Sequence, residues 1–190
     1  MVEKLVIVLD VDETLIYSST HTLLNRPPDF VLGGEYFTHI RPGAIDFLKT
    51  IIADDRFRVG IYSKATGDYI LEFITGVGLK ESDFELIFDR SRLVKKVYDY
   101  GPWARGRGIE YFKDLKKVKR RLGCHIDRMV AIDDIPSNYP RSYGNVLRVP
   151  EYVGECDDNI FIKLLECLNM LYGADDVRQE NKHIYDNYDT

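Results

Sequence analysis

Two short apolar runs in this chain end directly in aspartates. Residues 5–9 read LVIVL and precede Asp10 and Asp12, while residues 129–132 read MVAI and precede Asp133 and Asp134. An unbroken apolar run of this length is typical of a strand buried on both faces, at the centre of a parallel sheet. Carboxylates crowded at a strand end repel one another, and they cost stability unless a cation or ligand holds them. The two runs therefore predict a parallel sheet with a binding site at its edge.

The rest of the chain alternates between strand-like and helix-like patterns. Strand-like runs cover 57–63, 84–89 and 145–149, and helical spacing of apolar residues marks 41–55, 66–79 and 158–173. Such alternation predicts an α/β fold with a doubly wound parallel sheet, whose ligands bind beyond the carboxyl ends of the strands. Residues 29–40 carry two strand-like runs around Gly33-Gly34, which predicts a hairpin.

The chain length and the absence of linkers favour one domain. The 190 residues contain no repeat and no low-complexity linker, so we expect a single domain over 1–173. Residues 174–190 are polar and lack a convincing apolar face, and we expect a mobile or loosely docked tail there.

Charge and cysteine content limit the compartment and the partners. The net charge is −5, so nothing global favours nucleic acid or an anionic membrane as a partner. The three cysteines form no CxxC pair, and no apolar run approaches the roughly 20 residues that span a bilayer. We see no signal-peptide pattern either, and we expect a soluble intracellular protein of the cytoplasm or nucleus.

Five motifs, in order along the chain, resemble those of one enzyme family. DVDETLIYS (10–18) is similar to the DLDETLVHS of the small CTD phosphatases, a branch of the haloacid dehalogenase superfamily that includes the NLI-interacting factor-like proteins. HIRPG, GIYSKA, YFKDLKKV and VAIDDIPSNY follow in the places of the family's KRPG, LFTAS, YVKDLSRL and LILDNSPASY. The resemblance spans about residues 5–150, and it implies a haloacid dehalogenase-like, Rossmann-type fold with a small hairpin insertion and no large cap domain.

The resemblance also implies a role for each matched residue. Asp10 would be the nucleophile that forms an aspartyl-phosphate, and Asp12 the general acid and base. The other implied roles are a phosphoryl-oxygen donor, a phosphate-neutralising cation and the carboxylate that orients this cation: Ser63, Lys113 and Asp133. Magnesium would be held by the carboxylates of Asp10 and Asp134 and by the backbone carbonyl of Asp12.

Two residues depart from the small phosphatases, and one segment is longer. This chain has Ser63 where they have threonine and Asp134 where they have asparagine; both replacements keep the oxygen that the role needs. The longer segment, 94–108, corresponds to an insertion that helps the family grip a phosphopeptide, and the alternative is a solvated hairpin. Its candidate substrate-binding residues are Lys95, Lys96, Trp103, Arg105 and Arg107.

The basic run KKVKRR (116–121) could serve as a nuclear-import or nucleic-acid signal. We expect it to lie on a helix that begins near Lys113, where a solvated face is the simpler interpretation. The sequence thus favours a magnesium-dependent protein serine/threonine phosphatase with phosphoprotein substrates, such as peptides like the RNA polymerase II tail. The alternatives are a phosphohydrolase for a small metabolite or a nucleic-acid phosphate end, and a catalytically silent binding module.

Overall fold

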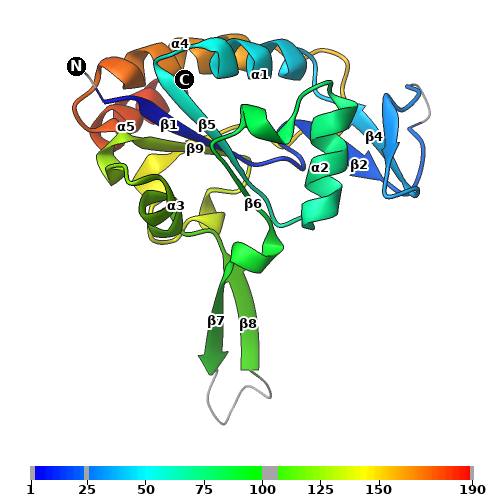
Figure 1. Cartoon of the computed structure of the whole chain (residues 1–190), viewed down its shortest axis with the longest axis horizontal. Helices are drawn as coiled ribbons and strands as arrows, with labels where there is room; N and C mark the ends of the chain where they lie inside the picture. Colours follow the sequence, from blue (N-terminus) through cyan, green and yellow to red (C-terminus); the bar gives the residue numbers. More distant parts are fainter. Residues whose placement is uncertain (1–2, 24–25, 100–106, 189–190) are drawn as a thin grey trace.

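A parallel sheet forms the centre of the molecule (Figure 1). The computed structural model describes residues 3–23, 26–99 and 107–188. The sheet has five strands in the order β10-β9-β1-β5-β6, and every neighbouring pair is parallel. In chain order these strands are β1 Leu5–Leu9, β5 Phe57–Tyr62, β6 Leu86–Phe88, β9 Met129–Asp133 and β10 Val146–Arg148. The predicted α/β parallel sheet is confirmed.

Helices cover both faces of this sheet, as a doubly wound fold requires. The helices are α1 Ala44–Ala53, α2 Gly67–Gly76, α3 Leu115–Leu122, α4 Ile160–Gly173 and α5 Val177–Tyr188. Alternate side chains of β1 separate the two cores: Ile7 packs with α1, α2 and α4, whereas Val8 packs with α3. Figure 1 shows α1 and α4 along one side of the sheet and α3 on the other.

Two smaller β-structures flank the sheet. Strands β2 Ile16–Ser19, β3 Phe30–Leu32 and β4 Tyr36–Ile40 form an antiparallel sheet in the order β2-β4-β3. The predicted hairpin around Gly33-Gly34 is its β3–β4 pair. Strands β7 Val94–Asp99 and β8 Arg107–Phe112 pair antiparallel with each other and project from the body (Figure 1). This projection is the expected hairpin insertion.

Short 3-10 turns connect several of these elements. They are η1 Glu81–Asp83, η2 Arg90–Arg92, η3 Ile126–Arg128, η4 Pro136–Asn138 and η5 Tyr143–Asn145. In the described part of the chain, no helix is both long enough and apolar enough to cross a membrane.

The C-terminal segment differs from the expected mobile or loosely docked tail. Helix α5 buries Val177, Asn181 and Ile184, whose side chains are 0%, 1% and 6% exposed. Asn181 Nδ2 donates to the backbone oxygens of Val146 at 2.7 Å and Gly144 at 3.2 Å. A polar residue therefore occupies the middle of the buried face of α5. A search of the sequence for apolar residues at helical spacing does not detect a face of this kind.

Candidate active site

The carboxyl ends of three adjacent strands bring the predicted acids together. Asp10 follows β1, Asp133 ends β9 and Ser63 follows β5, and these strands are neighbours in the order β9-β1-β5. Asp10, Asp133 and Asp134 are all buried, and each offers a carboxylate oxygen such that the three lie within 4.8 Å of one another. This close set of acids needs positive charge beside it.

Lys113 supplies that charge from below the acids. Its side chain is completely buried, and Nζ lies 2.8 Å from Asp10 Oδ1 and 2.6 Å from Asp133 Oδ2. Burial disfavours the charged amine, but the two carboxylates outweigh it, and the net effect raises the pKa of Lys113 above its usual value. Its backbone N–H donates to the Asn138 carbonyl at 2.7 Å, which fixes the end of β8 against η4.

Asp133 has both carboxylate oxygens occupied by donors. Oδ2 accepts from Lys113, and Oδ1 accepts from the Ile135 backbone N–H and from Asn138 Nδ2, each at 2.9 Å. These three bonds fit a residue that orients Lys113, and they leave Asp133 less free to bind a further ligand than Asp10 or Asp134.

Asp10 is bound on one side only. Its Oδ1 accepts from the Val11 backbone N–H at 2.8 Å and from Lys113, whereas Oδ2 has no hydrogen-bond partner among the described residues. Burial raises the pKa of Asp10 well above its usual value, and Lys113 opposes that rise. The free oxygen is the one that can meet a ligand.

Asp134 also accepts few hydrogen bonds for a buried carboxylate. The Thr14 hydroxyl donates to its Oδ1 at 3.4 Å. Burial and then the neighbouring Asp133 raise the pKa of Asp134. Buried carboxylates with spare oxygen lone pairs are the donor set that a hard divalent cation needs, so Asp10 and Asp134 fit such an ion.

Asp12 is held by a residue of another element. The Tyr69 hydroxyl, from α2, donates to Asp12 Oδ1 at 2.6 Å and lies 2.8 Å from Ser18 Oγ. Burial raises the pKa of Asp12, and the bond from Tyr69 opposes the rise. The next residue, Glu13, turns the chain away from β1 with a positive φ of 56°. Burial and the nearby acids raise the pKa of Glu13 to about 7.

Ser63 is positioned to donate toward the same site. It is 1% exposed, and its Oγ accepts from the Ala65 backbone N–H at 3.0 Å. Because that bond uses a lone pair, the hydroxyl proton remains available for an acceptor.

A cavity of about 550 Å³ lies over these residues. Asp10, Asp12, Ser63 and Asp134 line it, while Lys113 and Asp133 are buried beneath. The catalytic and metal candidates predicted from the sequence thus lie at one site. Further lining residues that it did not identify are Ser18, Tyr36, Tyr69, Arg90 and Asn138.

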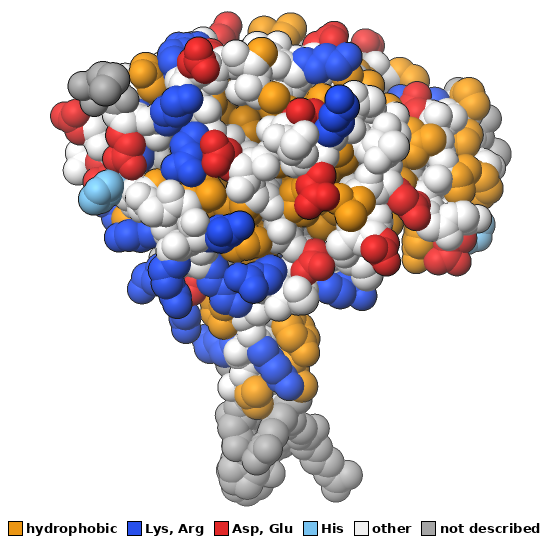
Figure 2. Space-filling model, viewed as in Figure 1, with side chains coloured by type: hydrophobic (Ala, Val, Ile, Leu, Met, Phe, Trp, Pro, Cys, Tyr) orange, Lys and Arg blue, Asp and Glu red, His pale blue; other side chains and the backbone are white. Residues whose placement is uncertain are grey.

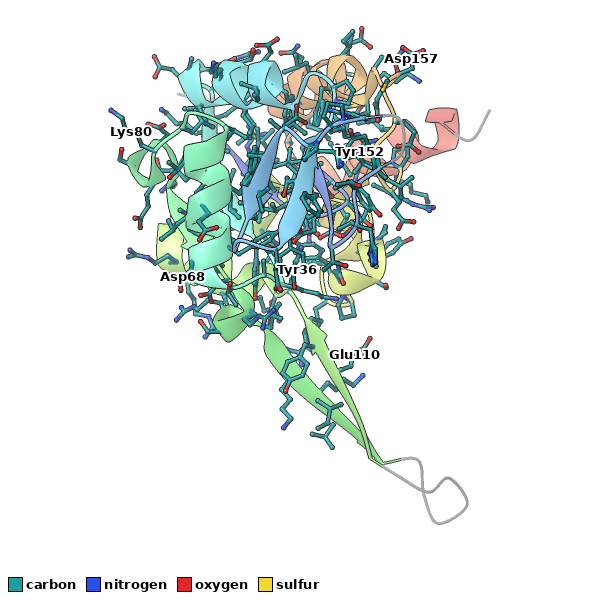
Figure 3. The ribbon with its side chains drawn as sticks, turned by 90° about the vertical axis from the view of Figure 1, so that its right-hand side faces the viewer. Tyr36, Asp68, Lys80, Glu110, Tyr152 and Asp157 are labelled. Atoms are coloured by element: carbon teal, nitrogen blue, oxygen red, sulfur yellow. The ribbon has the colours of Figure 1, made fainter. Side chains whose placement is uncertain are left out.

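The missed residues carry no local signal in the sequence. Tyr69 lies in the first turn of α2, where an aromatic residue is ordinary, and its contact with Asp12 joins positions 57 apart. Tyr36 comes from β4 and points toward the end of the molecule from which the β7–β8 hairpin projects (Figure 3). Ser18 and Asn138 are the exceptions, because they lie within the family-like motifs DVDETLIYS and VAIDDIPSNY and could have been identified from them.

The structure describes only part of the predicted substrate-binding set. Lys95 and Lys96 lie exposed on β7, and neither lines the cavity. Trp103 and Arg105 lie outside the described residues, and Arg107 begins β8 without a described side chain. The proposed grip on a phosphopeptide therefore stays a prediction.

Comparison with known proteins identifies relatives across most of the chain. The family of NLI interacting factor-like phosphatases matches residues 5–178. A probable C-terminal domain small phosphatase of Dictyostelium discoideum is 27% identical over 182 residues, which cover 90% of this chain and 52% of that protein. CTD nuclear envelope phosphatase 1B of Danio rerio is 25% identical over 195 residues, covering 93% and 71% respectively. This chain thus spans about half the length of the Dictyostelium relative.

A solved structure supports the fold. The fission yeast RNA polymerase II CTD phosphatase Fcp1, bound to beryllium fluoride, superposes with a TM-score of 0.53 at 18% identity. The match covers 88% of this chain and 50% of Fcp1. The expected haloacid dehalogenase-like fold is confirmed.

Proposed function

The chain belongs to the NLI interacting factor-like phosphatase family, and on that premise we propose that it is a magnesium-dependent protein phosphatase. It hydrolyses phosphoserine and phosphothreonine through an aspartyl-phosphate on Asp10. The observation that carries the proposal is the buried Lys113, bonded to Asp10 and Asp133 beneath a cavity that Asp12 also lines. This arrangement provides a nucleophile, a charge partner and a second acid within one site.

Asp10 attacks the phosphorus atom. The bonds from Val11 and Lys113 hold one oxygen of Asp10, so the carboxylate cannot rotate freely, and the other oxygen is left to attack a phosphoryl group in the cavity that Asp10 lines. Lys113 favours the ionised form that a nucleophile requires. Transfer breaks the bond between phosphorus and the leaving oxygen, and the phosphoryl group stays on Asp10 until water attacks it.

Asp12 moves the proton in both halves of the reaction. It donates to the leaving serine or threonine oxygen, and it then accepts a proton from the attacking water. Burial raises its pKa, which suits a group that must be protonated at one step and ionised at the next. Tyr69 fixes the side chain through Oδ1, which leaves the other carboxylate oxygen to carry this proton.

The acids fit a magnesium ion, which would neutralise charge on the phosphoryl group when bound. Asp10 and Asp134 would hold it with their carboxylates, and Asp12 with its backbone carbonyl. Asp133 belongs to the same acidic cluster, but Lys113, Ile135 and Asn138 already donate to its carboxylate, so we assign it to orienting Lys113 and not to the ion.

Ser63 binds a phosphoryl oxygen, and Lys113 neutralises charge from beneath the acids. The Ser63 hydroxyl donates into the cavity from the end of β5, and Lys113 lies below the acids. Phosphoryl transfer depends chiefly on positioning and charge stabilisation, so these two groups complete the requirement.

The surroundings of the cavity favour a large substrate. No large cap domain covers the site in the described part of the chain, and the β7–β8 hairpin projects beside the body (Figure 1). The hairpin exposes apolar side chains, with Val97 and Ile109 each 53% exposed and Tyr111 49% exposed. We propose that this surface contacts a phosphopeptide, and that peptides like the repeat of the RNA polymerase II C-terminal domain are among the substrates.

One substrate screen tests the proposal. The enzyme is assayed with magnesium on phosphoserine and phosphothreonine peptides, on sugar phosphates, and on oligonucleotides with 3′- or 5′-phosphate ends. We expect kcat/KM to be highest for the phosphopeptides, and we expect Asp10→Asn to abolish that activity. Preference for a sugar phosphate or an oligonucleotide end would instead identify the alternative phosphohydrolase. If no substrate, including an aryl phosphate, is hydrolysed, the chain is a binding module.

A further inference from the structure

Helix α3 presents a strongly basic surface to solvent. Leu115 and Val118 face the core, and no acidic residue lies within the helix. We call the remaining cations the basic face of α3: Lys116, Lys117, Lys119, Arg120 and Arg121. All are exposed except Lys117, which is half-buried.

The basic face belongs to a wider asymmetry of charge. Residues 90–128 contain 13 of the 26 Lys and Arg residues but 4 of the 31 Asp and Glu residues, although the whole chain has a net charge of −5. Figure 2 shows the Lys and Arg side chains gathered over α3 and the base of the β7–β8 hairpin. A helix face that only contacts solvent could carry charges of both signs, so solvation alone does not explain this local excess of positive charge.

The concentration of charge costs stability. Residues three and four apart on a helix are neighbours, so Lys116 repels Lys119 and Arg120, and Lys117 repels Arg121. Within the described ranges, none of the five cations pairs with a carboxylate. The last turn gains from the helix dipole, but that gain does not reach Lys116 and Lys117 in the first turn.

The basic face is joined to the cavity by the 3-10 turn η2. Lys117 Nζ donates to the backbone oxygens of Arg92 at 2.6 Å and Leu93 at 3.2 Å. At the other end of this turn, Arg90 lines the cavity, and its Nε donates to the Lys64 carbonyl at 3.2 Å. Positive side chains therefore run from the cavity across η2 to α3.

From this continuity we infer that the basic face of α3 is an exosite for the substrate. It binds acidic or phosphorylated residues that flank the phosphoserine or phosphothreonine in the cavity. The inference rests on the proposed function, since it assigns a second contact to the same protein substrate. A flanking acidic segment would remove the repulsion among the five cations, and it would do so only while the substrate is bound.

The composition of the face favours a peptide over the other polyanions. It contains no aromatic side chain on which a base could stack, and its apolar residues Leu115 and Val118 are buried. A membrane-binding helix, in contrast, places apolar side chains beside its basic ones at the surface.

Two matched phosphopeptides test the exosite. Both carry one phosphoserine. One has neutral flanking residues, and the other has four glutamates next to the phosphoserine. The acidic peptide is made in two versions, with the glutamates on the amino-terminal or on the carboxyl-terminal side. At low salt we expect the wild-type protein to prefer the acidic peptide by about tenfold in kcat/KM, which is what a few screened surface charges provide. The preference should disappear at about 0.5 M salt.

The variant removes three charges from the last turn of α3. Lys119→Gln/Arg120→Gln/Arg121→Gln should lose the preference through a rise in KM for the acidic peptide, with kcat and turnover of nitrophenyl phosphate unchanged. Its control, Lys4→Gln/Lys49→Gln/Lys163→Gln, removes the same net charge from β1's amino end, α1 and α4, and it should keep the preference. Circular dichroism checks the fold of both, and Arg121→Gln alone replaces the triple variant if that variant does not fold.

Each remaining outcome decides against the exosite. A preference retained by the α3 variant, or lost equally by the control, means that the face does not contact the substrate. Binding of an oligonucleotide or of anionic vesicles that the α3 variant alone loses, without any effect on peptide preference, would assign the face to that partner instead. If the wild-type protein hydrolyses nitrophenyl phosphate but neither peptide, the proposed protein substrate is wrong and the exosite fails with it.

Discussion

The Tyr69 hydroxyl lies 2.6 Å from Asp12 Oδ1, so a residue of α2 holds an acid of the loop that follows β1. Ser18 Oγ, from β2, lies 2.8 Å from the same hydroxyl. Three elements thus determine where the Asp12 carboxyl points. Because an ionised carboxylate only accepts hydrogen bonds, the single hydroxyl proton of Tyr69 goes to Asp12 when that acid is charged.

Tyr69→Phe should therefore lower kcat more for difficult leaving groups than for easy ones. A hydrogen bond to a charged group is worth enough to cost about tenfold to a hundredfold in kcat on a phosphoserine peptide. A dinitrophenyl phosphate, whose leaving group needs no proton, should lose much less. The control is Tyr36→Phe, since Tyr36 lines the same cavity and packs edge-on against Tyr69 at 6.1 Å without contacting Asp12. Equal losses on both substrates would show that Tyr69 supports the fold rather than proton transfer.

Asp10→Asn should abolish turnover, by at least about a thousandfold, because it removes the nucleophile. The fold should survive, since Lys113 keeps its bond to Asp133. A structure of the wild-type protein with beryllium fluoride checks the assignment, and we expect the fluoride complex on an oxygen of Asp10. A complex on Asp12 or Asp134 would assign the nucleophile to that residue instead.

Activity should require magnesium, and calcium should replace it poorly, because calcium prefers more ligands at longer distances. Asp134→Asn keeps an oxygen ligand and should retain part of the activity, whereas Asp134→Ala should lose nearly all of it. Titration of each variant with magnesium measures the difference, and the activity of Asp134→Asn should recover at higher magnesium concentration. Full activity of the wild-type protein in excess chelator would contradict the proposed metal role.

The raised pKa of Asp134 predicts a pH-dependent gain in stability on removing its charge. The folded-state pKa lies above the unfolded value, so the charged carboxylate costs stability at neutral pH, and the cost disappears as the pH falls through the folded-state pKa. Without metal, Asp134→Asn should therefore raise Tm by about 2–4 °C near neutral pH, the shift that roughly 1 kcal/mol produces in a chain of this size. At about pH 3 the difference should be small, because the pH is then below the ordinary aspartate pKa and Asp134 is mostly protonated in both the folded and the unfolded protein.

Calorimetry of both proteins in chelator, at each of the two pH values, measures the difference in Tm. Because the other titratable groups are the same in the two proteins, their effects on Tm cancel in this difference. A higher Tm for the wild-type protein at neutral pH would mean that Asp134 is stabilised by contacts that outweigh its burial. Added magnesium should reverse the order, since the wild-type site binds the ion more tightly.

Much of this site could be predicted because parallel strands end at a common edge. Asp10 and Asp133 follow apolar runs that read as buried strands, so their meeting follows from the sheet alone. Tyr69 could not be predicted in this way, because its place over Asp12 depends on how α2 packs after β5. Such a contact is set by tertiary packing and leaves no pattern in the local sequence.

The C-terminal helix shows the same limit for the fold. Apolar residues Val177 and Ile184 are seven positions apart, and among the described side chains between them the buried one is Asn181. The amide is stable there because its Nδ2 donates to the backbone oxygens of Val146, which begins β10, and of Gly144, which lies within η5. Only folding brings those acceptors next to the amide, so from the sequence alone a polar residue at this position is expected to be exposed to solvent.

The β7–β8 hairpin should contribute to binding of phosphopeptides but not of small substrates. Val97 and Ile109 are directly opposite each other in the pair, so their exposed side chains share one face of the hairpin. Val97→Ser/Ile109→Ser should raise KM for a phosphopeptide by roughly tenfold, because two apolar contacts are lost. Turnover of nitrophenyl phosphate should not change, since that substrate reaches only the cavity.

Two further sets of changes test the segment that joins β7 to β8 in the sequence. Trp103→Ala and the paired Arg105→Ala/Arg107→Ala should also raise KM for phosphopeptides, because an aromatic face suits proline rings and arginines suit a second phosphate. Ile162→Ser/Met170→Ser is the control, since these α4 side chains are 66% and 53% exposed on the opposite layer of the fold. Losses on both substrates would make the hairpin a structural element. If all the hairpin variants leave both substrates unaffected, the hairpin holds none of the residues that dominate phosphopeptide binding, and the proposed contact with it is wrong.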